Sequence, residues 1–480
     1  MSMANGVNER FDFSESLPNL ADVPHVHMIA VGGSGMSGVA RLFLADGVQL
    51  SGSDNVELPV LDDLRAQGAR IAVGYAAANV AEVPDGAVVV VSSAINELNP
   101  ELVEVRRRGL RVLHRSQGLA MLMQGRRGLA VAGANGKTTT SGMATAALAA
   151  LGEKPSFAIG ANVAGLGVNA APGEGDVFVV EADESDGSFV VYHPDVAIVT
   201  NIKDDHLDFY GTSANLAKAY EVFAATIATD GLLVACADDD GSRALADERR
   251  EAGARVLTYG RSDDADVRIV SEHGAGFAWG ARVALPGGRE VDLALEVPGA
   301  HNVLNATGVL TALVEGLGID AERAAHSLSA FRGTSRRFEP RGEAAGVRVV
   351  DDYAHNPGKL EALVRTADAL KESGRLFVVF QPHLYSRTQN AALGLAEALD
   401  GADRALVLDV YGAREQPVEG VSGRLITDVM TSGVATFTPT ADDALAVLLE
   451  EVRSGDLVVT VGAGDITHLG PRILESLERR

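Results

Sequence analysis

Twice in this sequence an apolar run ends in a glycine-rich segment, and a stretch of helical period follows directly. A strand that turns through glycines into a helix is the first half of a βαβ unit, and repeated units of this kind build mostly parallel sheets. The pattern therefore predicts an α/β fold. The predicted strand, turn and helix are His25–Val31, Gly32–Gly38 and Val39–Asp46 in the first case, and Gly128–Ala132, Gly133–Thr139 and Thr138–Leu151 in the second.

Further apolar runs of strand length extend this pattern over the whole chain. A length of 480 residues exceeds one ordinary core and suggests about three domains. We place them at residues 1–122, 123–330 and 331–480, and we expect residues 255–298 to be rich in strands and turns and to form an antiparallel flap. The other predicted strands are 87–92, 177–181, 196–200, 347–351, 376–380, 404–408 and 456–461.

Composition narrows the possible partners and the compartment. The formal net charge of −24 would repel nucleic acid and anionic membranes, so we expect neither as the main partner. The single cysteine, Cys236, excludes an internal disulfide. The start of the chain carries acidic side chains and no continuous apolar stretch, and no window reaches the roughly 20 apolar residues of a membrane span. We therefore expect a cytoplasmic protein.

The first glycine segment is followed by Asp54 at the spacing typical of dinucleotide-binding proteins, which alone suggests a nicotinamide or flavin enzyme. Glycines and free N–H groups at a helix start would receive any nucleotide diphosphate, including that of a UDP-sugar. A tight turn without a ligand is a third interpretation. The motif predicts a diphosphate site without fixing the nucleotide. Its residues are Gly33, Ser34, Gly35, Met36, Ser37 and Gly38.

The second glycine segment is a shortened phosphate-binding loop, in which Val131 stands where the full Walker A motif has its first glycine. The remaining G-x-x-G-K-T core still supplies backbone amides for phosphates, an ammonium group for the β/γ oxygens and a hydroxyl for Mg²⁺. Two phosphate-cradling loops in one chain predict two phosphorylated ligands. The residues of this loop are Gly133, Ala134, Asn135, Gly136, Lys137, Thr138 and Thr139.

Acidic residues follow the predicted strand 177–181, at the edge where parallel sheets place their ligands. Glu181 is our candidate Mg²⁺ ligand, because Mg²⁺ takes few carboxylate oxygens and keeps several waters. Asp183, Glu184 and Asp186 are consistent with a solvated acidic turn. His206 follows the next strand beside carboxylates, so we expect it to bind a second metal ion rather than to be structural.

The third block carries two polar clusters, Asp351–Pro357 and Gln381–Thr388, each directly after a predicted strand. Because both clusters follow strand ends, they can face one cleft. Arg336, Arg337 and Arg387 are candidates for holding carboxylate or phosphate groups, although a solvated linker also accounts for the Arg336–Arg337 pair.

Taken in order, these segments resemble the Mur ligase family, and most closely its alanine-adding branch. The resemblance runs from residue 25 to about residue 465. It implies an N-terminal Rossmann-like domain for a UDP-sugar, a central P-loop ATPase-like domain with a mostly parallel sheet, and a C-terminal Rossmann-like domain for the amino acid. The segments that carry it are Gly32–Gly38, Gly133–Thr139, Glu181–Phe189, Thr200–Gly211, His301–Ala306, Asp351–Pro357 and Gln381–Thr388.

The resemblance also implies a reaction in which ATP, UDP-N-acetylmuramate and L-alanine give ADP, phosphate and an amide, with Mg²⁺ as the metal. The enzyme would be a monomer or a homodimer. Lys137 would hold the phosphates, Thr138 and Glu181 would bind one Mg²⁺, and His206 would bind the second metal ion.

The remaining roles are implied in the same way. Asn302 would contact the adenine of ATP and Asp352 its ribose, with Arg337 also on the ATP side. The amino-acid pocket would be lined by His355, His383 and Arg387, and the sugar nucleotide would be bound by Gly33, Ser34, Gly35, Met36, Ser37, Asp54, Ser92 and Ser93.

Three features depart from the family pattern. Ala134 and Asn135 stand where the family commonly has Thr and His, and Asn356 replaces a frequent second histidine after His355. Leu384 stands where the alanine-adding branch usually has arginine, which removes one positive charge from the expected pocket and leaves the strictness for alanine open. Three other functions remain possible: a ligase adding a preformed peptide to the same UDP-sugar, a nicotinamide-dependent oxidoreductase, and a nucleotide-binding regulatory protein.

Overall fold

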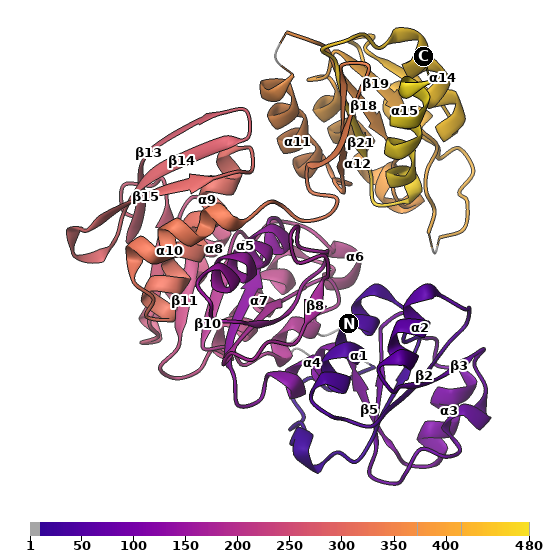
Figure 1. The fold of residues 1–480 in the computed structure, drawn as a ribbon, viewed down its shortest axis with the longest axis vertical. Helices are drawn as coiled ribbons and strands as arrows, with labels where there is room; N and C mark the ends of the chain where they lie inside the picture. The colour runs from indigo at the N-terminus through magenta and orange to yellow at the C-terminus, as the bar shows by residue number, and fades with distance from the viewer. Residues whose placement is uncertain (1–9, 372, 414, 480) are drawn as a thin grey trace. The chain divides into compact units, whose positions relative to one another are not determined.

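The computed structural model describes residues 10–371, 373–413 and 415–479, which form three sheets flanked by helices (Figure 1). The chain divides into two compact units, one of residues 1–273 with 279–332 and one of residues 274–278 with 333–480. Two sheets belong to the first unit and the third belongs to the second. The α/β class with mostly parallel sheets is confirmed, and the three predicted domain ranges stay a prediction.

The N-terminal sheet has five parallel strands in the order β3-β2-β1-β4-β5. All four valines of β4 are buried, as expected for a strand covered on both faces. The strand order reverses between β1 and β4, and open parallel sheets bind ligands at such a point. The elements are β1 (Val26–Ile29), α1 (Ser34–Ala45), β2 (Leu50–Asp54), α2 (Pro59–Ala66), β3 (Arg70–Val73), β4 (Val88–Val91), α3 (Pro100–Arg107), β5 (Arg111–His114) and α4 (Arg115–Met123).

Helix α1 begins earlier than the sequence predicted. We expected a turn over Gly32–Gly38 and a helix from Val39, whereas α1 already starts at Ser34. Gly35 and Gly38 therefore lie inside the helix, where a Cβ would be 2.0 Å from the Nη1 of Arg115 and 2.8 Å from the Cβ of Ala170, respectively. These two glycines permit close packing rather than a turn of the chain.

The central sheet has ten strands in the order β15-β14-β13-β12-β11-β10-β6-β9-β7-β8. Along this spatial order, neighbouring strands from β12 to β7 pair in parallel. Strand β8 is antiparallel to β7, and β15 is antiparallel to β14. The antiparallel pairing expected within residues 255–298 is thus present, and it extends the central sheet. The strands are β6 (Arg127–Ala132), β7 (Ser156–Ala158), β8 (Ala170–Ala171), β9 (Val177–Glu181), β10 (Val196–Val199), β11 (Leu232–Cys236), β12 (Val256–Gly260), β13 (Val267–Ala275), β14 (Ala278–Ala284) and β15 (Glu290–Leu295).

The side chains of β6 alternate between two cores, one on each face of the central sheet. Leu129 and Val131 pack in the core that contains the helices α5 and α9, and Ala130 and Ala132 pack in the core on the other face. That second core continues into the N-terminal sheet, which explains why the first two sheets form one compact unit. The helices here are α5 (Lys137–Ala150), α6 (Leu207–Tyr210), α7 (Ser213–Ala225), α8 (Asp240–Glu251), α9 (Ala300–Thr311) and α10 (Ala321–Ser327).

The sheet of the second unit has six strands in the order β16-β17-β21-β18-β19-β20, with β16 antiparallel to β17 and the others parallel. Across the part of the chain that the structure describes, no helix combines the length and apolar character needed to cross a membrane. The elements are β16 (Glu339–Ala344), β17 (Val347–Asp352), α11 (Pro357–Leu370), β18 (Leu376–Phe380), α12 (Tyr385–Leu399), β19 (Arg404–Val407), α13 (Arg424–Thr427), β20 (Ala435–Phe437), α14 (Ala441–Glu451), β21 (Leu457–Val461) and α15 (Leu469–Glu478).

Candidate active site

The second glycine segment, Gly133–Thr139, joins the end of β6 to the start of α5, and we call it the phosphate loop. Two of its residues have backbone conformations that favour glycine, because φ is 137° at Gly133 and 88° at Gly136. A Cβ at Gly133 would lie 2.0 Å from the Oγ1 of Thr200, so a larger residue would have to displace its neighbour. The tight turn brings the start of α5 to the carboxyl edge of the sheet.

The backbone amides of the phosphate loop serve two purposes. Ala134 N and Asn135 N donate to the backbone and side-chain oxygens of Asn201 at 3.1 and 3.0 Å, which fixes the loop beside the end of β10. The N–H of Thr140 donates to the residue four positions earlier, as the helix requires. The N–H groups of residues 137–139 precede that bond and point out of the helix start, where they and the helix dipole favour an anion.

The ammonium group of Lys137 is held by one backbone oxygen and one buried carboxylate. Its Nζ donates to Gly133 O at 2.6 Å and to Glu184 Oε1 at 2.9 Å, and it lies 2.7 Å from Glu184 Oε2. Burial opposes the charged form of Lys137, but the carboxylates of Glu184, Asp183 and Glu181 outweigh it and raise the lysine pKa. The loop therefore keeps a positive charge at the helix start.

A solvated acidic turn is the wrong interpretation for Glu184. Its side chain is 1% exposed, and it pairs with Lys137. The sequence did hold a signal for a role of Glu184 at the site, because this residue lies three positions after a strand that ends at the ligand-binding edge. Its burial could not be predicted, because the exposure of a loop residue depends on which other segments pack over it. Here the Tyr210 hydroxyl donates to the backbone oxygen of Glu184 from α6 and covers it.

Glu181, the last residue of β9, meets the hydroxyl of Thr138. Thr138 Oγ1 donates to Glu181 Oε1 at 2.9 Å, and Gly160 N donates to Glu181 Oε2 at 2.7 Å. A hydroxyl and a carboxylate at one point are hard oxygen donors of the kind that Mg²⁺ takes, with waters and phosphate oxygens at its other positions. The arrangement fits the predicted Mg²⁺ ligands, which stay a prediction.

His206 lies beside this cluster at the start of α6, in a left-handed backbone conformation with a φ of 54°. Its Nε2 is 3.9 Å from Glu184 Oε1 and 3.9 Å from Asp205 Oδ1. Among the described residues, no three or more His, Cys, Asp or Glu side chains are grouped as a metal site would require. The structure brings His206 to the phosphate loop, and its predicted role as a second metal ligand stays a prediction.

Asn302 presents a buried amide to the region beside the phosphate loop. Its Nδ2 donates to Pro298 O at 2.7 Å, whereas its Oδ1 has no hydrogen-bond partner within the described part of the chain. Leaving a buried acceptor unsatisfied is costly, and the amino group of an adenine would satisfy it. Asn305, on the same helix α9, lies against Gly136, where a Cβ would be 3.0 Å from its Oδ1. The geometry thus fits the predicted adenine contact.

The side chain of Asp54 binds the backbone of the first glycine segment. Gly32 N donates to Asp54 Oδ2 at 2.8 Å, and the carboxylate is 7% exposed, so it acts at least in part on the loop itself. The side chains of Met36 and Ser37 are buried, and a ligand would meet these two residues through their backbone. The N–H groups of residues 34–36 open α1 and form a second helix start suited to an anion.

Arg115 lies across this helix start and is not among the residues predicted from the sequence. A Cβ at Gly35 would be 2.0 Å from Arg115 Nη1, so the guanidinium group rests on the first turn of α1. A positive charge there strengthens a site for an anion. Arg115 directly follows β5, so the rule that ligands gather at strand ends could have identified it.

Ser92 and Ser93 follow β4 at the same edge of the N-terminal sheet. Ser93 Oγ donates to Asp186 Oδ2 at 2.6 Å and lies 3.0 Å from the Nε2 of His114. These contacts tie the segment after β9 to the N-terminal sheet. The Ser93 hydroxyl is therefore engaged with protein groups, and a sugar-nucleotide contact would have to share or replace them.

In the second unit, the structure brings together the predicted amino-acid residues His355 and His383. Their ring centroids are 6.3 Å apart, and His383 stacks on Tyr411 with centroids 5.9 Å apart. Arg387 lies in the first turn of α12, which begins at Tyr385, two residues after His383. Leu384, the N-cap of α12, has a φ of 67°, which is unusual for a branched side chain.

Asp352 and the arginine pair occupy the start of the same unit. Asp352 is buried and accepts from two backbone amides at 2.7 Å each; burial raises its pKa, although Arg337 and these amides favour the carboxylate. The guanidinium groups of Arg336 and Arg337 lie 4.7 and 5.0 Å from the ring centroid of Tyr353. The arginine pair is packed on an aromatic ring and is not a solvated linker.

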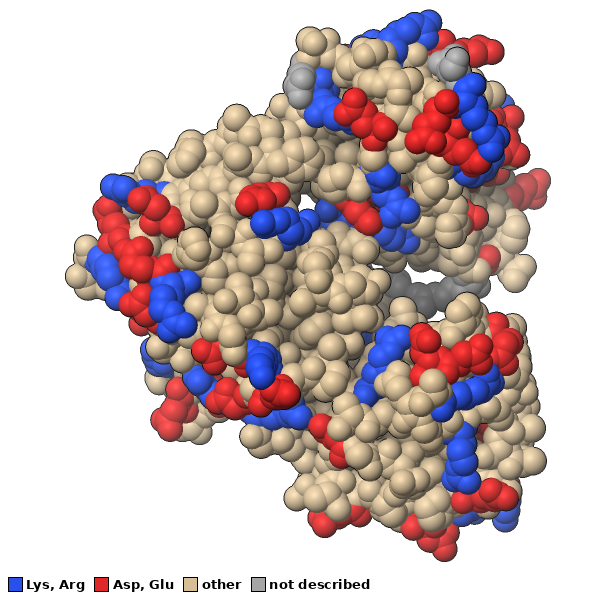
Figure 2. Space-filling model, viewed as in Figure 1, with Lys and Arg blue, Asp and Glu red and all other residues tan. Residues whose placement is uncertain are grey.

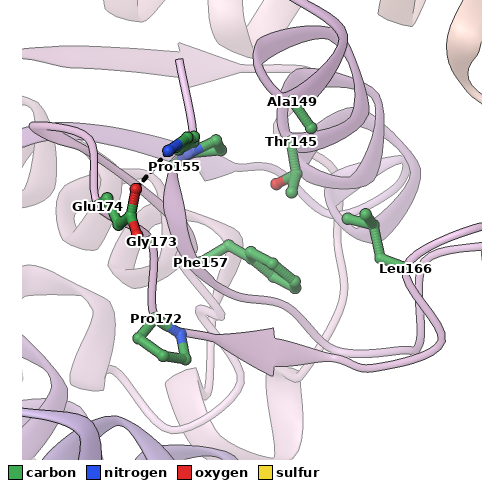
Figure 3. Close-up of a pocket in the computed structure, with 9 residues that line it drawn as sticks. Thr145, Ala149, Pro155, Phe157, Leu166, Pro172, Gly173 and Glu174 are labelled. Atoms are coloured by element: carbon green, nitrogen blue, oxygen red, sulfur yellow. Dashed lines mark hydrogen bonds and ion pairs between the residues drawn. The ribbon is translucent and has the colours of Figure 1, made fainter. Parts of the chain in front are cut away.

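A separate cavity of about 310 Å³ lies near the C-terminal end of α5, away from the phosphate loop at its N-terminal end (Figure 3). Phe157 and Leu166 give it apolar walls, and Lys154 and Glu174, which form an ion pair, also line it. The hydroxyl of Thr145 donates to the backbone of its own helix. The cavity contains none of the predicted site residues.

Charged side chains of both signs are intermixed over the face of the molecule shown in Figure 2. The net charge of −24 is therefore not a guide to the potential at one point of the surface. Local groups decide it: at the start of α5 these are Lys137 and the carboxylates of Glu184, Asp183 and Glu181, and at the start of α1 the guanidinium group of Arg115.

Comparison with known protein families covers nearly the whole chain. Residues 25–127 match the Mur ligase family catalytic domain, residues 131–313 match the Mur ligase middle domain, and residues 336–464 match the Mur ligase glutamate ligase domain. A relative from Paenarthrobacter aurescens, named UDP-N-acetylmuramate--L-alanine ligase, is 50% identical over 463 residues, which are 96% of this chain and 99% of the relative. A relative of the same name from Kineococcus radiotolerans is 49% identical over 97% of this chain and 98% of its own.

Solved structures give the same match. The crystal structure of a UDP-N-acetylmuramate-alanine ligase from Thermotoga maritima has a TM-score of 0.77 and 29% identity, covering 95% of this chain and 99% of its own. A murein peptide ligase from Psychrobacter arcticus has a TM-score of 0.67 at 24% identity, covering 95% and 99%, and shows the shared fold.

Proposed function

Because this chain belongs to the Mur ligase family, we propose that it joins L-alanine to UDP-N-acetylmuramate in a reaction driven by ATP. The observation that carries the proposal is the 50% identity, over 96% of the chain, to a relative named for that reaction. The site geometry supports it independently, since the first unit holds two helix starts suited to anions at the carboxyl edges of two sheets.

The phosphate loop is the proposed site for ATP. The amides of residues 137–139 would receive the phosphates, Lys137 would contact the β/γ oxygens, and Asn302 Oδ1 would accept from the adenine amino group. Thr138 and Glu181 would hold Mg²⁺, which supplies positive charge that balances the phosphate oxygens. The first helix start, with Arg115 across it, would receive the diphosphate of UDP-N-acetylmuramate.

The reaction needs activation because a carboxylate does not react with an amine in neutral water. A carboxylate oxygen of the sugar's lactyl group attacks the γ-phosphorus, a new P–O bond forms, and the bond to ADP breaks. Lys137 stabilises the negative charge that develops on the transferred group. The product is an acyl phosphate, whose phosphate is a good leaving group.

The second step makes the amide. The uncharged amine of L-alanine attacks the acyl carbon, the C–N bond forms, and the C–O bond to phosphate breaks. One proton leaves the nitrogen, and His355 and His383 are our candidates for receiving it, since an imidazole titrates near neutral pH. Arg387 would hold the alanine carboxylate.

An assay of ADP release in a matrix of substrates tests the proposal. We expect ADP formation only when ATP, UDP-N-acetylmuramate and L-alanine are all present. Glycine and L-serine measure the strictness for alanine that Leu384 leaves open. ADP formation with a preformed tripeptide and none with L-alanine would overturn the assignment in favour of a peptide-adding ligase.

A matched pair of lysine variants tests the site. Lys137→Met should abolish alanine-dependent ADP release, whereas Lys154→Met, at an exposed lysine of the same unit, should leave it unchanged. Because Lys137→Met leaves the buried Glu184 without its partner, the double variant Lys137→Met/Glu184→Gln shows whether loss of activity persists when the fold is restored. Turnover near that of the wild type in either Lys137 variant contradicts the proposed site.

A further inference from the structure

The carboxylate of Glu184 pairs with the ammonium group of Lys137, which is the same group that a bound phosphate would contact. Lys137 Nζ has three N–H donors, and its near neighbours are Gly133 O at 2.6 Å and the two oxygens of Glu184 at 2.9 and 2.7 Å. Two of these donors are used, by Gly133 O and Glu184 Oε1, so a phosphate at the helix start would share the ammonium group with the Glu184 carboxylate and compete with it for the positive charge.

Of the two partners, Lys137 is the one that can move. Glu184 is 1% exposed, its backbone oxygen accepts from the Tyr210 hydroxyl, and its Oε1 is 3.9 Å from His206. Lys137 carries its charge at the end of a flexible four-carbon stem on the first residue of α5. A short displacement of that stem takes the ammonium group from the carboxylate to a phosphate bound at the amides of the same turn.

We propose that Glu184 is a positioning residue that holds the Lys137 ammonium group while the phosphate loop is empty and takes it back when ADP leaves. Glu184 then lowers the affinity for phosphate-bearing nucleotides and speeds the release of product. This inference rests on the proposed ATP site, but not on the identity of the other two substrates.

Calorimetric titration of the full-length protein with ATP, ADP and adenosine tests the proposal. Glu184→Gln keeps the shape of the side chain and removes its charge, so ATP and ADP should bind roughly tenfold more tightly, which corresponds to about 1.4 kcal/mol. Adenosine, which has no phosphate for Lys137 to contact, should bind with unchanged affinity. In turnover, KM for ATP and kcat should both fall, because ADP leaves more slowly.

Weaker binding of ATP to Glu184→Gln, or an equal change for adenosine, would overturn the proposal, because a merely structural role weakens all three ligands together. Glu184→Asp keeps the charge and shortens its reach by one methylene group, so its ATP affinity should lie between those of the wild type and Glu184→Gln. Affinity at or below that of the wild type in Glu184→Asp counts against the proposal as well.

Two controls isolate the mechanism. In a Lys137→Met background, Glu184→Gln should no longer tighten ATP binding, because the effect acts through the ammonium group. Glu174→Gln breaks an exposed lysine–glutamate pair of the same unit and should change no nucleotide affinity. A wild-type protein that binds ATP but does not ligate alanine would refute the proposed function alone, and the nucleotide titrations would still decide the role of Glu184.

Discussion

Lowering the pH from 7 to 5 should weaken the N-terminal sheet through His114, and the variant His114→Asn should remove that effect. His114 ends β5 and caps α4, where Ser116 N donates to its Nδ1 at 3.3 Å, so Nδ1 is an acceptor and carries no proton. Its Nε2 faces Ser93 Oγ at 3.0 Å. A second proton would have to enter at Nδ1, against the N–H of Ser116, in a side chain that is 1% exposed.

The size of the effect follows from the pKa in the two states. Burial, together with Arg115 and Arg10, lowers the pKa of His114 from 6.5 to about 4 in the folded protein, although Asp186 favours the proton. As the pH falls, the unfolded chain takes up the proton first, so stability present above pH 6.5 is lost on the way down to about 4. Between pH 6.5 and pH 5 this difference in protonation extends over about 1.5 pH units, which lowers the free energy of unfolding by about 2 kcal/mol.

Hydrogen–deuterium exchange of peptides from β5 and α4, corrected for intrinsic exchange at each pH, measures the local free energy of unfolding. Between pH 7 and pH 5, His114 should account for a loss of about 2 kcal/mol there in the wild type. His114→Asn should lose far less, because Asn caps a helix without titrating. The variant also loses the contacts of the His114 ring with Phe11 and Phe13, and this loss lowers stability equally at both pH values.

The exposed His193 provides the control, and His193→Asn should follow the wild type at both pH values. If the wild type and His114→Asn lose the same protection against exchange on acidification, His114 is not the cause of the pH dependence.

Three further predictions concern the loop, the metal and the buried charge. Gly133→Ala places a Cβ 2.0 Å from Thr200 Oγ1 and should weaken ATP binding by calorimetry more than tenfold, whereas Gly47→Ala, with open space around it, should bind ATP normally. Thr138→Val removes the hydroxyl that meets Glu181 and should raise the Mg²⁺ concentration for half-maximal ADP release about tenfold, with little change in melting temperature. Glu101→Ala removes a fully buried carboxylate that accepts from several donors, and urea unfolding should show a loss of about 3–5 kcal/mol; a loss below 1 kcal/mol contradicts the buried network.

The strands were predictable because their signal is local. Val177–Glu181 and Leu376–Phe380 were predicted with the bounds that the structure has, since each is an apolar run that ends abruptly at polar residues. The phosphate loop was predictable for a related reason: the order of strand, glycines and lysine fixes where the helix starts and which amides are left open. The places of Lys137, Thr138 and Glu181 at one point follow from that order and from strand ends sharing one edge.

The rest of the site depends on contacts between distant residues, which no local pattern encodes. The start of α1 at Ser34 was missed because Gly35 reads as a turn residue, while its purpose is to let Arg115 approach from 80 positions further along the chain. The burial of Glu184 was missed because an acidic run is typical of a solvated loop, and the lysine that pairs with it is 47 residues away. The roles of His206, His355 and His383 depend on ligands and stay predictions.

Four acidic residues at the end of β9 and directly after it lie next to the two helix starts that we propose as anion sites. Each of these carboxylates has a protein partner: Glu181 accepts from the hydroxyl of Thr138, Asp183 from that of Ser185 and Asp186 from that of Ser93, and Glu184 pairs with the ammonium group of Lys137. Glu184 is thereby balanced by a positive charge, whereas hydroxyl groups hold Glu181 and Asp186 in place without neutralising them.

The short spacing between Glu184 and Asp186 connects the two helix starts through one segment of the chain. Asp186 contacts the edge of the N-terminal sheet, Glu184 contacts the phosphate loop, and only two positions separate them on a segment whose start is fixed by the pairing of β9 with β6 and β7. A ligand that engages the Ser93 hydroxyl would meet a group already bonded to Asp186, two positions along the chain from the residue that pairs with Lys137. Because coupling between two binding sites is reciprocal, any effect of the sugar nucleotide on ATP affinity must be matched by an equal effect of ATP on sugar-nucleotide affinity.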